Sequence, residues 1–135
     1  MQDAGSLPGV FDELEAAVAS LVAWARRMPS AGWKKRAGSD TAAEVLQALV
    51  TELAELGHAV EVGARSRPDR WRSPAPAPYP GALADRLAVV GRDLVDALRA
   101  APPDHQAWYA DEQAPAHALA RAALDAVSKA ATAAR

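Results

Sequence analysis

Apolar residues recur three and four positions apart in four separate stretches of this chain. Residues at this spacing lie on one face of an α-helix, so each stretch has one face to bury. No other stretch alternates strictly between apolar and polar residues, as a half-buried strand would. The pattern predicts an all-α fold, a single-domain up-down four-helix bundle over residues 1–135. The four apolar stripes are Leu7, Phe11, Leu14, Val18, Leu21, Ala25 and Met28; Ala42, Leu46, Leu49, Leu53, Leu56 and Val60; Leu83, Leu87, Val90, Leu94 and Leu98; and Ala116, Leu119, Ala120, Ala123, Leu124 and Val127.

Prolines, glycines and capping residues indicate where the helices begin and end. Thr41-Ala-Ala-Glu44 is a capping-box pattern in which Glu44 reaches back to the start of the second helix. Pro29 follows the first helix, and Pro102-Pro103 stops the third. The expected helices span about 9–28, 41–63, 82–100, and a fourth segment that begins between 111 and 115 and continues towards the C-terminus.

Two of the expected connections are longer than the roughly 2–8 residues that usually join helices in a bundle. Residues 65–81 form a long loop with five prolines, four of which alternate with other residues from Pro74 to Pro80. Alternating prolines favour extended polyproline II structure and block both helix and sheet. The run lacks the PxxP spacing, so we do not expect SH3-type recognition. The second long connection, 101–114, is also expected to be a loop.

The apolar composition is dominated by alanine, which accounts for 35 residues. Alanine favours helix but buries little apolar area. The last helix offers only Leu119, Leu124 and Val127 as large apolar residues, so we expect it to dock last and most weakly. A second copy would bury more apolar surface than the monomer can, which makes a homodimer an expected state.

Charge and cysteine content exclude several classes of function. The net charge of −2 creates no global attraction to nucleic acid or anionic lipid. The absence of cysteine excludes disulfides, thiolate nucleophiles and cysteine metal sites. No signal peptide or membrane-spanning run is found, so a soluble cytoplasmic protein without membrane association is expected. Arginine outnumbers lysine twelve to three and isoleucine is absent, which is typical of a bacterial, GC-rich genome.

The three histidines are the first candidates for chemistry. His58 falls nearly opposite the apolar stripe of its helix and should face solvent or a partner, and His105 lies in an expected loop. His117, in the first turns of the fourth helix, has Arg121 on the same side. No two histidines have the spacing of a metal pair on one helix, so no metal and no cofactor are expected. The Glu-x-x-His pair of bundle di-iron sites, the Gly-x-Ser-x-Gly turn and the glycine-rich phosphate loop are also missing, so no catalytic residue is assigned.

Two basic clusters with aromatic residues raise the possibility of nucleic-acid binding, because cations contact phosphates and aromatic rings stack on bases. In an up-down bundle, the loops that carry the clusters lie at opposite ends, so the clusters would not merge and nucleic-acid binding is not expected. The clusters are Trp24, Arg26, Arg27, Trp33, Lys34, Lys35 and Arg36, and Arg65, Arg67, Arg70, Trp71 and Arg72.

Trp33 with the segment 39–49, and the segment 94–104 with Trp108, resemble the DinB-like superfamily, which includes the N-terminal domains of mycothiol-dependent maleylpyruvate isomerases. The resemblance covers about two thirds of the chain and implies the same order of helices. The family holds a metal with one histidine in its second helix and two histidines in its last helix that have three residues between them. Ala48 occupies the first of these positions here, His117 matches one ligand, and Arg121 stands in place of its partner. The resemblance therefore implies that metal chemistry has been lost.

Three hypotheses for the function follow from these observations, and we rank a non-catalytic function first. It is a helical bundle that mediates protein association, with itself or with a partner. The alternative is a DinB-like enzyme or small-ligand binder with an altered, metal-free cleft. There His117 and Arg121 would be the ligand-binding residues, with Arg121 holding an anionic group and His117 transferring a proton. An accessory protein of nucleic acids that uses the loop arginines is a third, weaker hypothesis.

Overall fold

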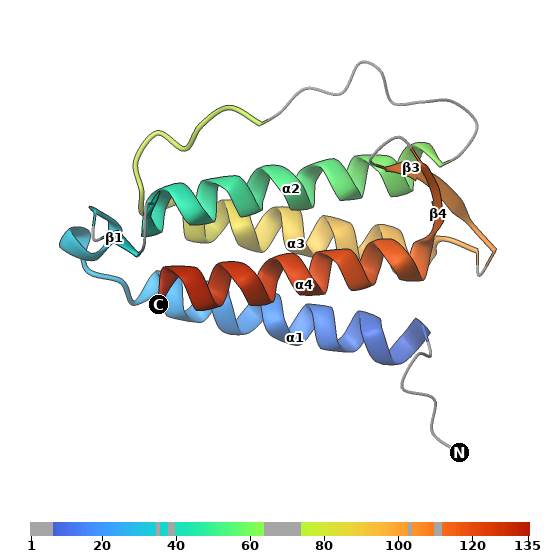
Figure 1. The fold of residues 1–135 in the computed structure, drawn as a ribbon, viewed down its shortest axis with the longest axis horizontal. Helices are drawn as coiled ribbons and strands as arrows, with labels where there is room; N and C mark the ends of the chain where they lie inside the picture. The colour runs from blue at the N-terminus through green and yellow to red at the C-terminus, as the bar shows by residue number, and fades with distance from the viewer. Residues whose placement is uncertain (1–6, 35, 38–39, 64–73, 103, 110–111) are drawn as a thin grey trace.

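Four α-helices pack side by side in the part of the chain that the computed structural model describes, residues 7–34, 36–37, 40–63, 74–102, 104–109 and 112–135 (Figure 1). They are α1 (Leu7–Arg26), α2 (Ala42–Val62), α3 (Ala82–Ala100) and α4 (Ala116–Ala134). A 3₁₀-helix, η1 (Ser30–Lys34), follows α1. The prediction of four helices over these stretches is confirmed.

The helix boundaries follow the capping signals closely. Thr41 Oγ1 accepts a hydrogen bond of 3.1 Å from the Glu44 N–H, and Glu44 Oε1 accepts one of 2.8 Å from the Thr41 N–H, so the predicted capping box is present at the start of α2. Both bonds satisfy N–H groups that have no partner within the helix. α3 spans 82–100 as expected, and α4 begins directly after Pro115.

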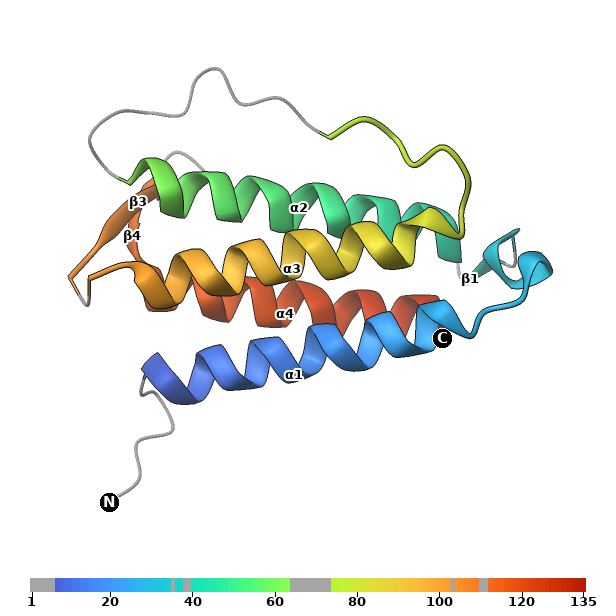
Figure 2. The same cartoon turned by 180° about the vertical axis from the view of Figure 1, so that it is seen from behind.

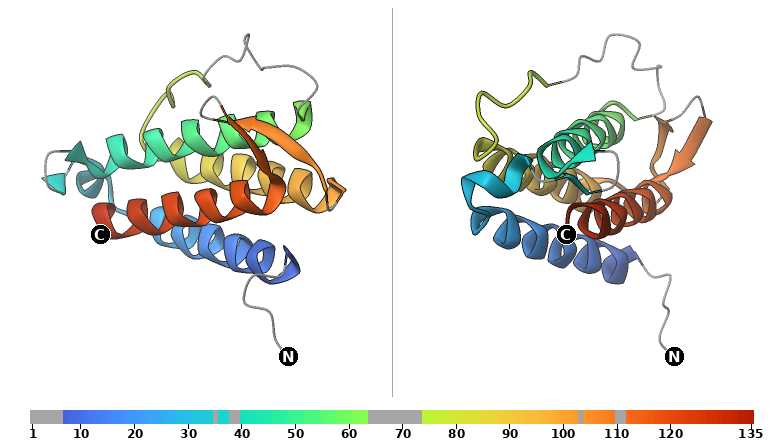
Figure 3. Two further views of the ribbon diagram at one scale, coloured as in Figure 1. Left: turned by 45° about the vertical axis from the view of Figure 1, so that its right-hand side comes forward. Right: turned by 60° about the vertical axis from the view of Figure 1, so that its left-hand side comes forward.

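Two short antiparallel hairpins lie between the helices, where loops were expected. β1 (Arg36–Ala37) pairs with β2 (Asp40–Thr41), and β3 (Gln106–Tyr109) pairs with β4 (Glu112–Pro115). Figure 3 shows the second hairpin leaning over the ends of α2 and α4. Its strands have four residues each, which is too short for an alternating pattern to be recognised. Ala107 is their one fully buried side chain. Packing against the helices stabilises them, and sequence reasoning missed that contribution.

The helices do not alternate in direction along the chain, so the up-down prediction is wrong at one connection. α1 and α3 are antiparallel, because Arg26 at the end of α1 pairs with Asp85 at the start of α3. α2 and α3 run in the same direction, and their C-terminal ends lie together (Figures 1 and 2). A connection as long as 63–81 is able to return along a helix of roughly 30 Å, whereas a short loop would force antiparallel neighbours.

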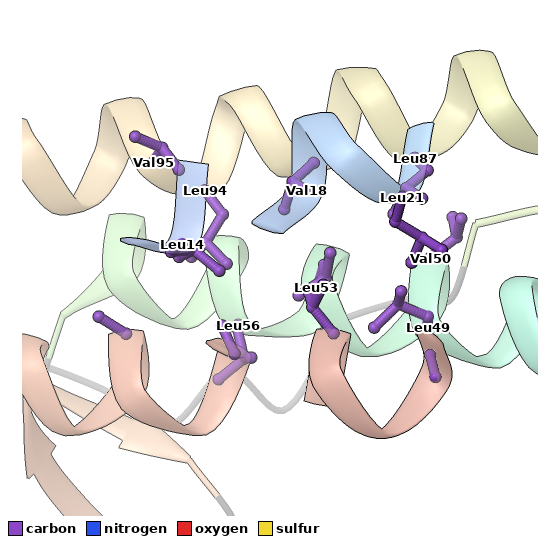
Figure 4. Close-up of a cluster of buried hydrophobic side chains, with 14 of the residues drawn as sticks. Leu14, Val18, Leu21, Leu49, Val50, Leu53, Leu56, Leu87, Leu94 and Val95 are labelled. Atoms are coloured by element: carbon purple, nitrogen blue, oxygen red, sulfur yellow. The ribbon is translucent and has the colours of Figure 1, made fainter. Parts of the chain in front are cut away.

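The predicted stripes form the core that the four helices share. α3 packs on α1 and α2, and α4 packs on the same two helices, so α3 and α4 lie diagonally across the core. Figure 4 shows leucine and valine side chains of α1, α2 and α3 meeting between the helices. Leu14, Leu53 and Leu87 are fully buried. From α4, Leu119 and Val127 are buried with five alanines, Ala116, Ala120, Ala123, Ala130 and Ala134. Within the described residues, no helix is long and apolar enough to span a membrane.

Candidate interaction site

His117 and Arg121, the two residues expected to bind a ligand, are both exposed on α4. They lie one turn apart on that helix, as their spacing requires. The two grooves described below are lined by other residues. Nothing in the structure tests a ligand at His117 and Arg121, and their role stays a prediction.

His58 and His105 are half-buried, and His105 has a structural contact. Its Nε2–H donates a hydrogen bond of 2.7 Å to the carbonyl oxygen of Val60 in the last turn of α2. Gly63, next to this contact, has a φ of 74°, a conformation that favours glycine. His105 thus ties the β3–β4 hairpin to the C-terminal end of α2. Among the described residues, no group of three or more His, Cys, Asp or Glu side chains is placed to hold a metal ion.

The basic clusters are only partly placed by the structure. Trp33 is buried in η1, and Trp24 is half-buried with the Arg135 guanidinium 5.8 Å from its ring centre. Both aromatic rings therefore have contacts within the chain. The side chains of Lys35 and Arg36, and the whole second cluster over 65–72, lie outside the residues that the structure describes.

Tyr109 on β3 is an ionisable group with a perturbed environment. Burial raises the pKa of its phenol, and the nearby carboxylates of Glu52 and Glu55 raise the pKa further. A phenol in this environment keeps its proton near neutral pH and is not available as a base. Tyr109 thus lies beside the carboxylates of α2, against which β3 packs.

An open groove of about 310 Å³ runs between α1 and α3 on the outside of the protein. Its apolar floor contains Val18 and Val22 from α1 and Gly91 and Val95 from α3. A Cβ atom at Gly91 would lie only 2.6 Å from Val18 Cγ1, so glycine is what lets the two helices approach this closely. Four charged residues also line the groove: Glu15, Arg26, Arg92 and Asp96. We call this feature the α1–α3 groove.

Ion pairs bridge α1 and α3 at both ends of this groove. Arg99 Nη2 lies 2.7 Å from Asp12 Oδ1 and 3.0 Å from Glu15 Oε1. The hydrogen bond with Glu15 is the main reason that the pKa of the Arg99 guanidinium lies above its usual value. At the other end, Arg26 Nη2 lies 3.3 Å from Asp85 Oδ1. These pairs are exposed, so they define the register of the helices more than they stabilise the fold.

The exposed face of α1 beside the groove has an ordered sequence of charges. Acidic residues occupy its N-terminal half, small residues its centre, and basic residues its C-terminal end. We call this surface the α1 face; its exposed members are Asp12, Glu13, Glu15, Ala16, Ala19, Ser20, Ala23, Arg26 and Arg27. The order of charges is visible in the sequence, but it defines a surface only because the structure shows all of these side chains exposed on one helix.

No family model, curated protein or solved structure matches this chain. The DinB-like resemblance is therefore neither supported nor contradicted, and it stays a prediction. The function has to be inferred from the surfaces of the molecule itself.

Proposed function

We propose that this chain mediates protein association and that it pairs with a second copy of itself through the α1 face and the α1–α3 groove. The observation that carries the proposal is the order of acidic, small and basic residues along the α1 face. A two-fold axis perpendicular to α1 reverses this order in the second copy. The acidic half of each α1 then lies against the basic end of the other, which is the self-complementarity that a two-fold interface requires.

The register of such a pair follows from the spacing of the residues. With Ala19 of each copy at the level of Ser20 of the partner subunit, Asp12 lies opposite Arg27 of the partner subunit. Glu15 lies two residues, about 3 Å along the axis, from the level of Arg26 of the partner subunit, within reach of its long side chain. Ala16 then lies opposite Ala23 of the partner subunit. Small residues at the centre let two helix backbones approach closely, at interaxial distances of about 8 Å. Each charge pair occurs twice because of the symmetry.

Apolar surface beside the α1 face supports the same interface. Val89 on α3 is 58% exposed, and it is one of only two large apolar side chains in the described residues that are this accessible. Val89 does not line the α1–α3 groove itself, but it lies one helical turn from Arg92, which does. Burial of Val89 and of the groove floor would remove apolar area from water, which drives association more strongly than exposed ion pairs do.

Sedimentation equilibrium of the purified protein tests the proposal. We expect a reversible dimer whose dissociation constant lies in the micromolar range. Ala19→Arg places a long cation at the centre of the interface and should weaken association at least about tenfold, or about 1.4 kcal/mol. Ala133→Arg makes the same change at an exposed position of α4 and should leave association unchanged.

A charge reversal distinguishes this antiparallel pairing from any other contact. Glu15→Arg and Arg26→Glu should each weaken the dimer, because each places like charges opposite one another twice. The double variant Glu15→Arg/Arg26→Glu should regain most of the affinity, since the opposite charges face each other again. A protein that stays monomeric at high concentration, or a double variant weaker than both single variants, would rule the proposal out.

A further inference from the structure

A second groove lies between the parallel helices α2 and α3, on a different side of α3 from the α1–α3 groove. We call it the α2–α3 groove. Its two halves differ. The N-terminal half is covered by residues 74–80 of the chain itself, which run outside the two helices before α3 begins (Figure 2).

The covering segment shows how this groove holds an extended chain. The Ala77 N–H donates a hydrogen bond of 3.1 Å to Gln47 Oε1 of α2, and the guanidinium of Arg86 on α3 donates to the Ala75 carbonyl oxygen. Ala77 is half-buried against the core, whereas Pro76 and Pro78 are exposed. The two helices thus contact backbone atoms and a small inward side chain, an arrangement that suits extended, proline-containing segments.

The C-terminal half of the same groove is open and has a volume of about 500 Å³. Helical periodicity places Glu61 on the same face of α2 as Gln47, and Asp93 and Ala97 on the same face of α3 as Arg86. The open half is therefore a continuation of the covered half. Three small residues from the end of α3 and the position after it, Ala97, Ala100 and Ala101, make up most of its apolar lining, with Val60 and Pro102 beside them.

The open half carries strong negative charge. Three carboxylates line it, from Glu61, Asp93 and Asp96, and its lining contains no lysine or arginine. The parallel helices also bring both of their C-terminal ends to this half, and each end carries a partial negative charge. Arg99, the basic residue in the last turn of α3, is bonded to Asp12 and Glu15 on the α1 side.

We propose that the open half of the α2–α3 groove binds an extended segment of a partner protein that carries arginine or lysine side chains. The segment continues the path of residues 74–80, its small residues face the alanine floor, and its cations contact Glu61 and Asp93. Continuity with the covered half argues for an extended backbone, and the charge of the lining argues for cations. The site shares Asp96 with the lining of the α1–α3 groove, but Glu61 and Asp93, which contact the cations, lie outside that groove.

Fluorescence anisotropy with a labelled peptide tests the site. The probe is Ala-Pro-Ala-Arg-Ala-Arg-Ala, and the matched control peptide has the uncharged isostere citrulline in place of both arginines. We expect saturable binding of the arginine peptide that weakens as salt is added, and binding of the citrulline peptide that is at least about tenfold weaker.

Variants of the exposed lining locate the bound peptide. Glu61→Gln/Asp93→Asn removes two charges without altering the shape of the groove and should weaken binding about tenfold or more. Ala100→Trp should block the groove sterically. The control Glu112→Gln/Asp125→Asn removes two exposed carboxylates elsewhere and should leave the affinity unchanged. Equal binding of both peptides, equal binding by the groove variants and the wild type, or equally tight binding of arginine amide alone would overturn the proposal.

Discussion

Helix α3 has two neighbours, and it meets them in opposite directions. Against α1 it is antiparallel, so each end of the pair combines the N-terminus of one helix with the C-terminus of the other, and ion pairs close both ends. Against α2 it is parallel, so both C-terminal ends and three carboxylates gather in one place. The direction of a helix thus decides whether charge along an interhelical groove is balanced or accumulates.

Two glycines provide the sharpest test of how closely the two pairs of helices pack. Gly91→Ala on the α1 side should destabilise the protein by about 1–3 kcal/mol, because the new Cβ would lie 2.6 Å from Val18 Cγ1 and a valine side chain in a helix has little freedom to move. Gly57→Ala on the α2 side should be neutral or stabilising by up to about 1 kcal/mol, since its Cβ would meet Leu94 Cα at 3.8 Å. Urea unfolding of both variants measures the difference. The same sign for both would show that the two pairs are packed alike.

The C-terminal end of α2 is the next most sensitive point of the parallel pair. Gly63→Ala forces a non-glycine residue into a φ of 74° and places its Cβ 3.0 Å from His105 Cε1. We expect a loss of about 1–2 kcal/mol in the free energy of unfolding. Gly81→Ala is the control, because Gly81 has a φ of −61° and meets only the exposed Tyr79 ring at 3.4 Å. If both variants were equally stable, the end of α2 would not be constrained by His105.

The segment that covers the N-terminal half of the α2–α3 groove should contribute a smaller amount. Gln47→Ala removes the acceptor for the Ala77 N–H and should cost about 0.5–1.5 kcal/mol. Gln113→Ala, at an exposed position of β4, is the matched control and should have no effect. Amide hydrogen exchange provides the direct readout, because exchange at Ala77 should accelerate in the Gln47 variant. Unchanged protection of that amide would contradict the contact.

The smallest effect on stability is expected when the ion pairs between the antiparallel helices α1 and α3 are removed. Arg99→Gln breaks the contacts with Asp12 and Glu15, yet these side chains are exposed and screened by salt. The melting temperature should fall slightly at low ionic strength and should equal that of the wild type at physiological salt. A large loss that persists at high salt would show that Arg99 acts through packing rather than through charge.

The core and the helix ends could be predicted from the sequence because they depend on local signals. The spacing of Leu46, Leu49 and Leu53 defines a face without reference to the rest of the chain, and Thr41 with Glu44 makes a capping box within one turn. The direction of α3 relative to α2 does not depend on a local signal and could not be predicted in this way. Antiparallel and parallel packing would bury the same stripe, so the pattern of Leu83, Leu87 and Leu94 does not distinguish them.

The candidate sites were harder to predict for the same reason. The order of charges on the α1 face is local and is visible in the sequence, although the residues predicted to bind a ligand were His117 and Arg121. The α2–α3 groove could not have been found, because Glu61 and Asp93 come together only when α2 and α3 are parallel. The β3–β4 hairpin escaped prediction since its buried contact, at Ala107, is made with helices distant in sequence.

The diagonal arrangement of consecutive helices has a consequence for how this protein folds. In the described residues, α1 barely contacts α2 and α3 barely contacts α4, so neither half of the chain forms a helical hairpin of its own. Each extensive interface joins helices that are separated by another helix or by the longest connection, which gives a high contact order for an all-helical protein. Folding should therefore be slow for a bundle of this size and strongly cooperative. Fragments cut within the 63–81 connection should be unfolded separately and should regain helical structure only when they are mixed.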